Sequence, residues 1–164
     1  MSLAPQHPRI GLGWDRHALA AGRPCTLAGI SLECAVGPVG HSDGDVLLHA
    51  LTDALLGAAG LDDLGTLFPN DDPQWSGAAS TAFVVHAMKL LQKENLRPLS
   101  ADLVVICEQP RIGKHRAEMR ERLAELLELP LDRVNLKGKS TEGGSEAAAS
   151  AIEVQAVVLL GALG

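Results

Sequence analysis

The pattern of apolar and polar residues predicts that strands and helices share one domain. Apolar residues three or four positions apart indicate helices, whereas short alternating or continuous apolar runs indicate strands. Strands are expected at residues 9–14, 25–28, 30–33, 101–107, 134–137 and 151–160, and helices at residues 43–60, 81–94 and 114–127. The strands at 25–28 and 30–33 are close enough to form a small hairpin, which we place at the edge of the sheet.

The helix at residues 43–60 carries the most informative polar pattern. Ser42 is predicted to be its N-cap, with Asp45 three residues later in the spacing of a capping box. At four-residue steps Asp45, His49 and Asp53 lie above one another, away from the apolar stripe. This grouping indicates either a solvated polar face or a binding site.

A second pair of candidate ligands follows the first strand. Asp15 and His17 are two residues apart, so in an extended chain both side chains point the same way. A D-x-H pair alone is common and has no necessary function. Together with His49, however, it supplies three of the four ligands of a tetrahedral zinc ion, and an open fourth position is typical of catalytic zinc.

Composition limits the classes of function. The chain has 164 residues, of which 46% are hydrophobic, and a formal net charge of -6, so it is the size of one globular domain and is not suited to binding nucleic acid. Three cysteines without a C-x2-C pair indicate neither disulfides nor a thiolate zinc site. No segment is long and apolar enough for a membrane helix, and we expect a cytoplasmic protein.

Three loops are rich in residues that bind polar ligands. Residues 61–73 combine acidic residues with Gly and Pro, residues 108–113 contain Pro110, and residues 138–144 contain Lys139, Ser140, Thr141 and Glu142. The last group suits phosphate oxygens and a divalent cation, although it lacks the Walker A spacing. The alternatives are an ordinary surface loop and plain connections between elements. Ser80 is expected to cap the helix at 81–94, and His86 to be a surface or packing residue.

Several motifs, in order along nearly the whole chain, resemble the 2-C-methyl-D-erythritol 2,4-cyclodiphosphate synthase family of the non-mevalonate isoprenoid pathway. The block H-S-D-G-D-x3-H-A-L-x-D-A-L-L is highly specific. The residues that carry the resemblance are Gly13-Trp14-Asp15-Arg16-His17, His41-Ser42-Asp43-Gly44-Asp45, the run from His49 to Ala58, Asp63-Leu64-Gly65, Leu67-Phe68-Pro69, Pro110-Arg111-Ile112 and Ser140-Thr141-Glu142-Gly143.

The resemblance implies an α/β (α+β) fold: a single compact domain with a mixed β-sheet covered by helices, assembled as a homotrimer with active sites between subunits. It implies a flexible N-terminus at residues 1–8 and a synthase domain at residues 9–164. The implied activity is that of a phosphorus-oxygen lyase, which converts 4-diphosphocytidyl-2-C-methyl-D-erythritol 2-phosphate to the cyclic diphosphate and CMP. Other enzymes of the pathway are possible partners.

The resemblance also implies roles for individual residues. Asp15, His17 and His49 would hold zinc, and Glu142 would hold magnesium or manganese. His41, Thr141 and Glu142 would be catalytic. The substrate contacts would be Asp15, His17, His41, Ser42, Asp63, the Gly65 backbone, Pro110, Arg111, Ile112, Lys139, Ser140 and Thr141. The chain has no serine or cysteine paired with a base, and none is needed because the attacking group would be the substrate's own 2-phosphate.

The chain departs from the family pattern at a few positions. Asn70 stands where Asp is usual, Lys139 where Thr is frequent, and residues 143–150 lack a Phe and an Arg that the family commonly carries near the trimer axis. The departures at Asn70 and after Glu142 support one alternative, a non-catalytic, zinc-stabilised trimer that binds a nucleotide or isoprenoid metabolite. Another alternative is a metal-dependent phosphohydrolase of different specificity.

Overall fold

The computed structural model describes residues 7–40, 42–146 and 150–163. Its main sheet has five strands in the order β4-β1-β7-β5-β6, in which only β5 and β6 are parallel. A separate sheet pairs β2 with β3. The elements are β1 (Arg9–Ala21), β2 (Cys25–Leu27), β3 (Ile30–Leu32), β4 (Val36–Pro38), α1 (Val46–Ala59), α2 (Leu64–Leu67), α3 (Ser80–Lys93), β5 (Leu96–Ile106), α4 (Ile112–Leu127), the 3-10 turn η1 (Leu131–Arg133), β6 (Val134–Lys139) and β7 (Ala151–Ala162).

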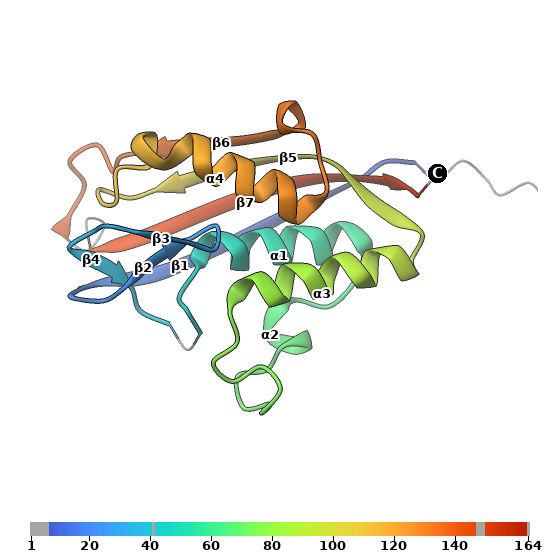
Figure 1. Ribbon diagram of the computed structural model, residues 1–164, viewed down its shortest axis with the longest axis horizontal. Coiled ribbons are helices and arrows are strands. Elements are labelled where there is room, and N and C mark those ends of the chain that lie inside the picture. The colour runs from blue at the N-terminus through green and yellow to red at the C-terminus, as the bar shows by residue number, and fades with distance from the viewer. Residues whose placement is uncertain (1–6, 41, 147–149, 164) are drawn as a thin grey trace, which may run out of the picture.

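The helices cover one face of the main sheet. Helix α1 packs on β1 and β7, α4 lies along β6, and α3 packs against α1 on the side away from the sheet (Figure 1). Buried leucine, valine and alanine side chains fill the space between these layers. The mixed sheet covered by helices agrees with the predicted fold class, and no helix among the described residues is long and apolar enough to cross a membrane.

Two glycines allow α1 to approach β1 closely. A Cβ atom at Gly11 would lie 2.0 Å from the Ala54 carbonyl oxygen, and one at Gly13 would lie 1.8 Å from the Ala50 carbonyl oxygen. Both distances are far below van der Waals contact, so only glycine fits. The approach brings the helix face that carries His49 onto the strand that carries Asp15 and His17.

The start of α1 differs from the prediction. The helix begins at Val46 and its N-cap is Asp45, whose Oδ1 accepts a hydrogen bond from Leu48 N at 3.1 Å. The predicted N-cap, Ser42, lies outside the helix, where its hydroxyl accepts from Gly44 N at 3.4 Å. Asp45 is fully buried and also accepts from Ala28 N and Gly29 N, because the β2–β3 hairpin folds back over the helix end.

Tertiary pairing lengthens several strands beyond their predicted ends. β1 continues to Ala21 because it pairs with β7 as far as Ala18 and then with β4. β5 begins at Leu96 rather than after the expected break at Pro98, since a register shift between Pro98 and Ser100 lets the proline lie within the ladder. The β2–β3 hairpin is not an edge of the main sheet, because β4 takes that place.

The opposite face of the sheet exposes apolar side chains. Ile10, Leu12 and Trp14 of β1 are 73%, 68% and 54% exposed, and Val157 of β7, which pairs with Leu12, is 38% exposed. An antiparallel sheet usually turns a polar face to water. This face therefore has the character of a protein–protein contact.

Candidate metal centre and active site

Three side chains from two elements meet between β1 and α1. His17 Nε2 and His49 Nδ1 lie 3.0 and 3.1 Å from the same oxygen, Oδ2 of Asp15. One ligand atom from each residue can be chosen so that all lie within 4.8 Å of one another. Among the described residues this is the one group of three or more such ligands, and it is the trio predicted from the sequence.

The charge of Asp15 is stabilised by its neighbours. Burial alone would raise the pKa of the Asp15 carboxyl, but the hydrogen bonds and charges of His17 and His49 outweigh burial and hold that pKa well below its usual range. The side chain is therefore an anion at neutral pH. A carboxylate between two imidazoles has the donor chemistry of a divalent metal site.

The trio fits a metal ion better than it fits an ordinary polar cluster. Two imidazole nitrogens crowd one carboxylate oxygen, and the ligands are separated by about the distance that tetrahedral coordination at roughly 2 Å requires. The Nδ1 atom of His17 is buried without a hydrogen-bond partner among the described residues. A cation accepted by these three groups would offset the cost of burying them together.

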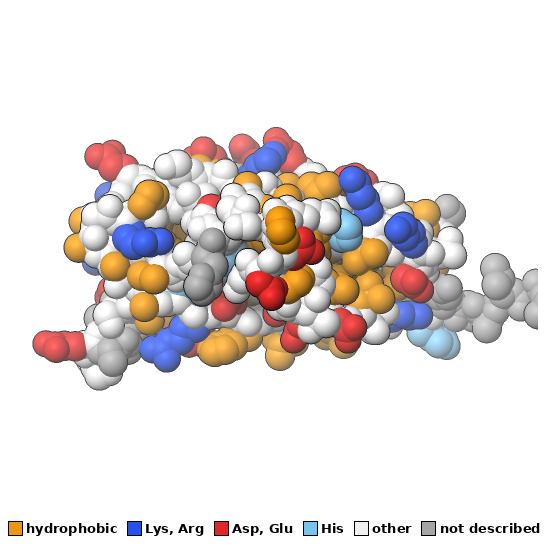
Figure 2. All heavy atoms as spheres, turned by 90° about the horizontal axis from the view of Figure 1, so that it is seen from below, with side chains coloured by type: hydrophobic (Ala, Val, Ile, Leu, Met, Phe, Trp, Pro, Cys, Tyr) orange, Lys and Arg blue, Asp and Glu red, His pale blue; other side chains and the backbone are white. Residues whose placement is uncertain are grey.

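The trio opens into a cavity of about 540 Å³. Asp53, Asp63 and Gly65 line the cavity beside the trio, together with Ser42. Asp53 accepts from Leu64 N at 2.7 Å and Asp63 from Thr66 N at 2.9 Å, so both carboxylates also fix the short helix α2, an element that the sequence pattern did not predict. Figure 2 shows this side of the molecule, where acidic side chains gather over the α2 region.

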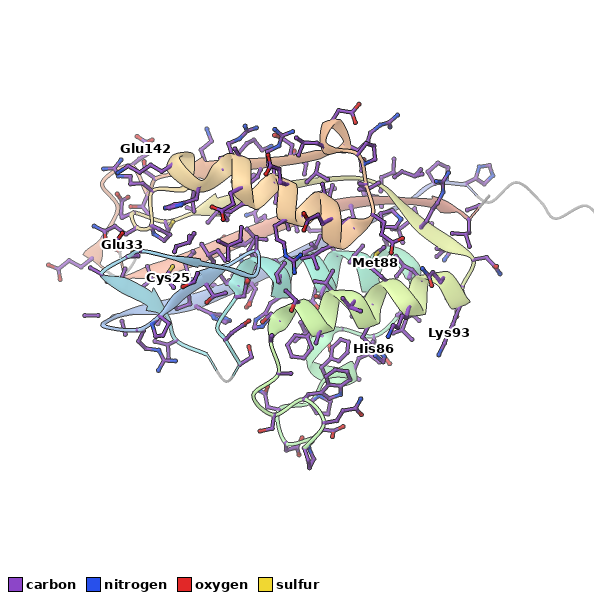
Figure 3. All side chains as sticks on the ribbon, in the orientation of Figure 1. Cys25, Glu33, His86, Met88, Lys93 and Glu142 are labelled. Carbon is purple, nitrogen blue, oxygen red and sulfur yellow. The ribbon has the colours of Figure 1, made fainter. Side chains whose placement is uncertain are left out.

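Aromatic side chains form the far wall of this cavity. Phe68 packs edge-on against Trp75 with ring centroids 4.8 Å apart and lies 5.0 Å from Phe83. His86 points from α3 toward these rings, 5.4 Å from Phe68 and 5.3 Å from Trp75 (Figure 3). Of the two roles predicted for it, surface residue or packing residue, the structure shows packing. These rings were not predicted to belong to the site, although three of the four Phe and Trp residues of the chain gather here.

A second cavity of about 590 Å³ lies where the parallel strands β5 and β6 end and α4 begins. This is the usual position of a ligand site in an α/β sheet. Arg111 and Lys139 supply cationic groups there. The other residues that line it are Cys107, Glu108, Pro110, Ile112, Gly113, Lys114, Gly138 and Ser140.

The loop after β6 is tied to the loop after β5. Glu108 accepts hydrogen bonds from the Thr141 hydroxyl and from Thr141 N, the latter at 2.7 Å, and these bonds lower the pKa of the Glu108 carboxyl. Glu142 follows with a positive φ of 52° and accepts from the Ser140 hydroxyl at 3.3 Å. It stands at the end of the molecule where α4 begins (Figure 3).

Comparison with known proteins places this architecture in a family. The family model described as the YgbB family matches residues 8–161. The chain belongs to the YgbB family.

Relatives of this YgbB-family chain carry informative names. It is 46% identical over 153 residues to the 2-C-methyl-D-erythritol 2,4-cyclodiphosphate synthase of Solibacter usitatus, a match that covers 93% of this chain and 96% of the relative. It is 52% identical over 134 residues to the "Bifunctional enzyme IspD/IspF" of Erythrobacter litoralis, covering 82% of this chain. The match spans only 35% of that longer protein.

Solved structures agree with these relatives. The solved structure of a 2C-methyl-D-erythritol-2,4-cyclodiphosphate synthase in its CDP-bound form superimposes with a TM-score of 0.88 and 45% identity, covering 93% of this chain and 99% of that one. The resemblance stated from the sequence is thereby confirmed, and so are the fold class and the expectation of an enzyme. The alternative of a non-catalytic trimer is not favoured.

The structure of this YgbB-family chain distributes the predicted site residues over two places. The first cavity is lined by the trio and by Ser42, Asp63 and Gly65. Residues 110–112, Lys139 and Ser140 line the second cavity. His41, predicted to be catalytic, lies outside the described residues, as do residues 1–6 of the expected flexible N-terminus and residues 147–149 of the departing segment.

One expected grouping does not form. Asp45 was predicted to share a polar face with His49 and Asp53, but its side chain turns into the protein and caps α1. Burial raises the pKa of the Asp45 carboxyl to about 7, against the opposing effect of the three N–H groups that donate to it. Asp53 does line the first cavity with His49, and burial raises the pKa of its carboxyl as well.

Proposed function

We propose that this chain converts 4-diphosphocytidyl-2-C-methyl-D-erythritol 2-phosphate to 2-C-methyl-D-erythritol 2,4-cyclodiphosphate and CMP, as a phosphorus-oxygen lyase of the non-mevalonate isoprenoid pathway. The observation that carries the proposal is the convergence of Asp15, His17 and His49 at the mouth of a cavity, in a chain whose relatives bear that enzyme's name. We further propose a cytoplasmic location.

Zinc is the metal that we assign to the trio. Two imidazoles and one carboxylate are a ligand set of catalytic zinc, and a fourth position stays open for a substrate oxygen. Bound there, zinc would supply a Lewis acid and a template for phosphate groups. The trio itself contributes the negative charge of Asp15 and two neutral donors, so the net charge of the occupied site would favour an anion.

The first cavity suits the sugar-phosphate part of the substrate. Asp63 and the Gly65 backbone are proposed to bind the erythritol hydroxyls, and both line the cavity next to the trio. Ser42, with His41, is proposed to contact phosphate; the Ser42 hydroxyl lies 3.2 Å from His49 Nε2. Carboxylates accept hydrogen bonds and do not donate them, so Asp63 favours the hydroxyls of a polyol over a phosphate.

The second cavity suits the cytidine diphosphate part. Residues 110–112 and Ser140 would contact cytosine and ribose, while Lys139 and Thr141 would contact the diphosphate. The CDP-bound structure of a 45% identical synthase supports a cytidine nucleotide as ligand. Glu142 is proposed to hold magnesium or manganese at the diphosphate. The cation would offset the negative charge of the diphosphate, which a net-acidic protein cannot offset alone.

The proposed reaction needs no nucleophile from the protein. An oxygen of the substrate's 2-phosphate forms a bond to the β-phosphorus, and the bond from that phosphorus to the bridging oxygen breaks, so the oxygen leaves with CMP. Burial raises the pKa of the Cys107 thiol to about 12 and that of Cys25 to about 11, so neither thiol is a nucleophile at neutral pH. The task of the chain is orientation, which can lower a barrier by roughly 7–11 kcal/mol at best.

We propose a homotrimer with active sites between subunits. The two cavities have no lining residue in common, although the substrate would have to reach both. A neighbouring subunit would bring its second cavity next to the first. The exposed apolar side chains Ile10, Leu12 and Trp14 support a subunit contact on that face of the sheet.

One incubation tests the function. Purified protein is incubated with zinc, magnesium and the cytidyl substrate, and the products are monitored by phosphorus NMR. The cyclic diphosphate and CMP should form in equal amounts. A ring-free phosphate product would instead identify a phosphohydrolase. Absence of any product, with substrate bound, would identify a non-catalytic binding protein and overturn the proposal.

A further inference from the structure

The imidazole of His49 is held at both ring nitrogens. Its Nδ1 faces Asp15 Oδ2 at 3.1 Å, and its Nε2 lies 2.9 Å from the hydroxyl oxygen of Ser80. Ser80 is the first residue of α3 and is fully buried. The sequence pattern predicted it as the N-cap of that helix, but the N-cap position is Ala79 and the hydroxyl makes no capping bond.

Asp43 fixes the orientation of Ser80. The Ser80 hydroxyl donates to Asp43 Oδ1, and the Ser80 backbone N–H donates to Asp43 Oδ2 at 3.0 Å. Because both oxygens of one carboxylate contact the same residue, the serine side chain has little freedom. Asp43 also stands at the N-terminal end of α3, where a negative charge is favourable.

The direction of these hydrogen bonds follows from donor and acceptor chemistry. A carboxylate can only accept, so the hydroxyl proton of Ser80 points toward Asp43. The oxygen of Ser80 is then left to accept from His49 Nε2–H. While no metal is bound, the same rule makes His49 Nδ1 the donor to Asp15 Oδ2. A metal ion between these two groups takes the place of that proton, and because Ser80 keeps the other proton on Nε2, Nδ1 then offers its lone pair to the proposed metal position.

Ser42 is the other hydroxyl near His49, and it is less suited to this role. It lies 3.2 Å from His49 Nε2 and is only partly buried, and its oxygen also receives the N–H of Gly44. No contact to a carboxylate orients it among the described residues. His17, in turn, has no partner for its second ring nitrogen there. The chain Asp43, Ser80, His49 is therefore specific to one ligand.

We propose that Ser80 and Asp43 are positioning residues, which fix His49 with its Nδ1 lone pair toward the metal position. The inference rests on the zinc centre proposed above and deepens it. Partners of this kind behind a ligating histidine orient the ring and raise its affinity for metal, and removal of one typically costs ten- to a hundredfold in metal affinity.

Zinc affinity of the full-length protein, measured by competition with a chromogenic chelator, tests the proposal. Ser80→Ala should weaken zinc binding by about ten- to a hundredfold. Thr52→Ala is the matched control: Thr52 is equally buried, lies on α1 one turn after His49, and donates to Leu48 O at 2.7 Å without contacting the imidazole. This control should keep the zinc affinity of the wild type, although it removes a buried hydroxyl.

A second variant and a spectroscopic signal separate positioning from general loss of structure. Asp43→Asn should also weaken zinc binding, and the Ser80→Ala/Asp43→Asn double variant should be little weaker than Ser80→Ala alone, because both changes break one chain. In zinc-loaded protein labelled with 15N-histidine, the His49 Nε2–H resonance should be visible in the wild type and in Thr52→Ala but lost in Ser80→Ala.

Unchanged zinc affinity in Ser80→Ala, or a His49 proton found on Nδ1 in the zinc-loaded wild type, would overturn the inference and leave the proposed synthase intact. A wild-type protein that binds no zinc at this trio would overturn both. The two failures are distinguishable because the wild type is measured first and by itself.

Discussion

Asp15 and His49 are in contact, Oδ2 to Nδ1 at 3.1 Å, although 34 positions separate them along the chain. No local interaction can produce this contact. It depends on α1 lying against β1, which in turn depends on the glycines that leave space for the helix backbone. The candidate metal centre is thus a consequence of how one helix packs on one strand.

Loss of the helix ligand should abolish metal binding. His49→Ala leaves two ligands on β1, and two ligands do not hold zinc against dilution and dialysis. We expect the variant to contain no zinc by elemental analysis and to have no turnover. His115→Ala, on α4 and away from the trio, is the control and should retain one zinc per chain. Full activity in a zinc-free His49→Ala protein would contradict the prediction.

A methyl group between β1 and α1 should displace His49 from Asp15 and His17. Gly13→Ala places Cβ 1.8 Å from the Ala50 carbonyl oxygen, so α1 must shift. We expect a loss of about 1–3 kcal/mol or more in the free energy of unfolding, measured in urea, together with weaker zinc binding. Gly57→Ala lies on α1 with nothing within 4 Å and should instead stabilise by about 0.5–1 kcal/mol. Equal stability of the two variants would count against this packing.

A charge on the exposed sheet face should prevent assembly. Leu12 is 68% exposed in the isolated chain, and Leu12→Asp would bury a carboxylate if that face is a subunit contact. Light scattering after size exclusion should give the mass of a trimer for the wild type and of a monomer for the variant. Val85→Asp, at a 43% exposed position on α3, should remain a trimer. A monomeric wild type would refute the proposed interface.

The second metal position should be separable from the first. Glu142→Gln removes a charge at an exposed carboxylate on the loop after β6, so the magnesium concentration needed for half-maximal activity should rise by about tenfold or more. Zinc content should stay that of the wild type, since Glu142 does not belong to the trio. Loss of zinc with an unchanged response to magnesium would reverse the assignment.

The cap of α1 should make stability depend on pH. Burial raises the pKa of Asp45 from 3.8 to about 7, so between those values the folded protein binds more protons than the unfolded chain. Stability from this group is present at low pH and is lost as the pH rises through about 7. The free energy of unfolding is measured in urea for zinc-free wild type and Asp45→Asn at about pH 5 and about pH 8. Between these pH values the wild type should lose about 1–3 kcal/mol of stability relative to the variant. A constant difference would contradict the raised pKa.

The local pattern predicted the elements better than their ends. The helix of α1 was recognised from its apolar stripe, but its start was placed near Asp43 rather than Val46, because Ser42 and Asp45 both have the chemistry of an N-cap. Only the approach of the β2–β3 hairpin selects Asp45. The short helix α2 escaped prediction since its two anchoring carboxylates, Asp53 and Asp63, belong to segments with no local helical signal.

The sequence by itself determined the family, and it predicted the candidate metal-binding trio and a loop at residues 138–144 suited to phosphate, because ligand types and spacings are properties of the chain. The tertiary structure alone decided that the trio meets at one oxygen of Asp15, that Ser80 and Asp43 stand behind His49, and that the predicted contacts divide between two cavities. The physical reason is that such contacts join residues far apart in the chain, and packing between strands and helices sets their geometry.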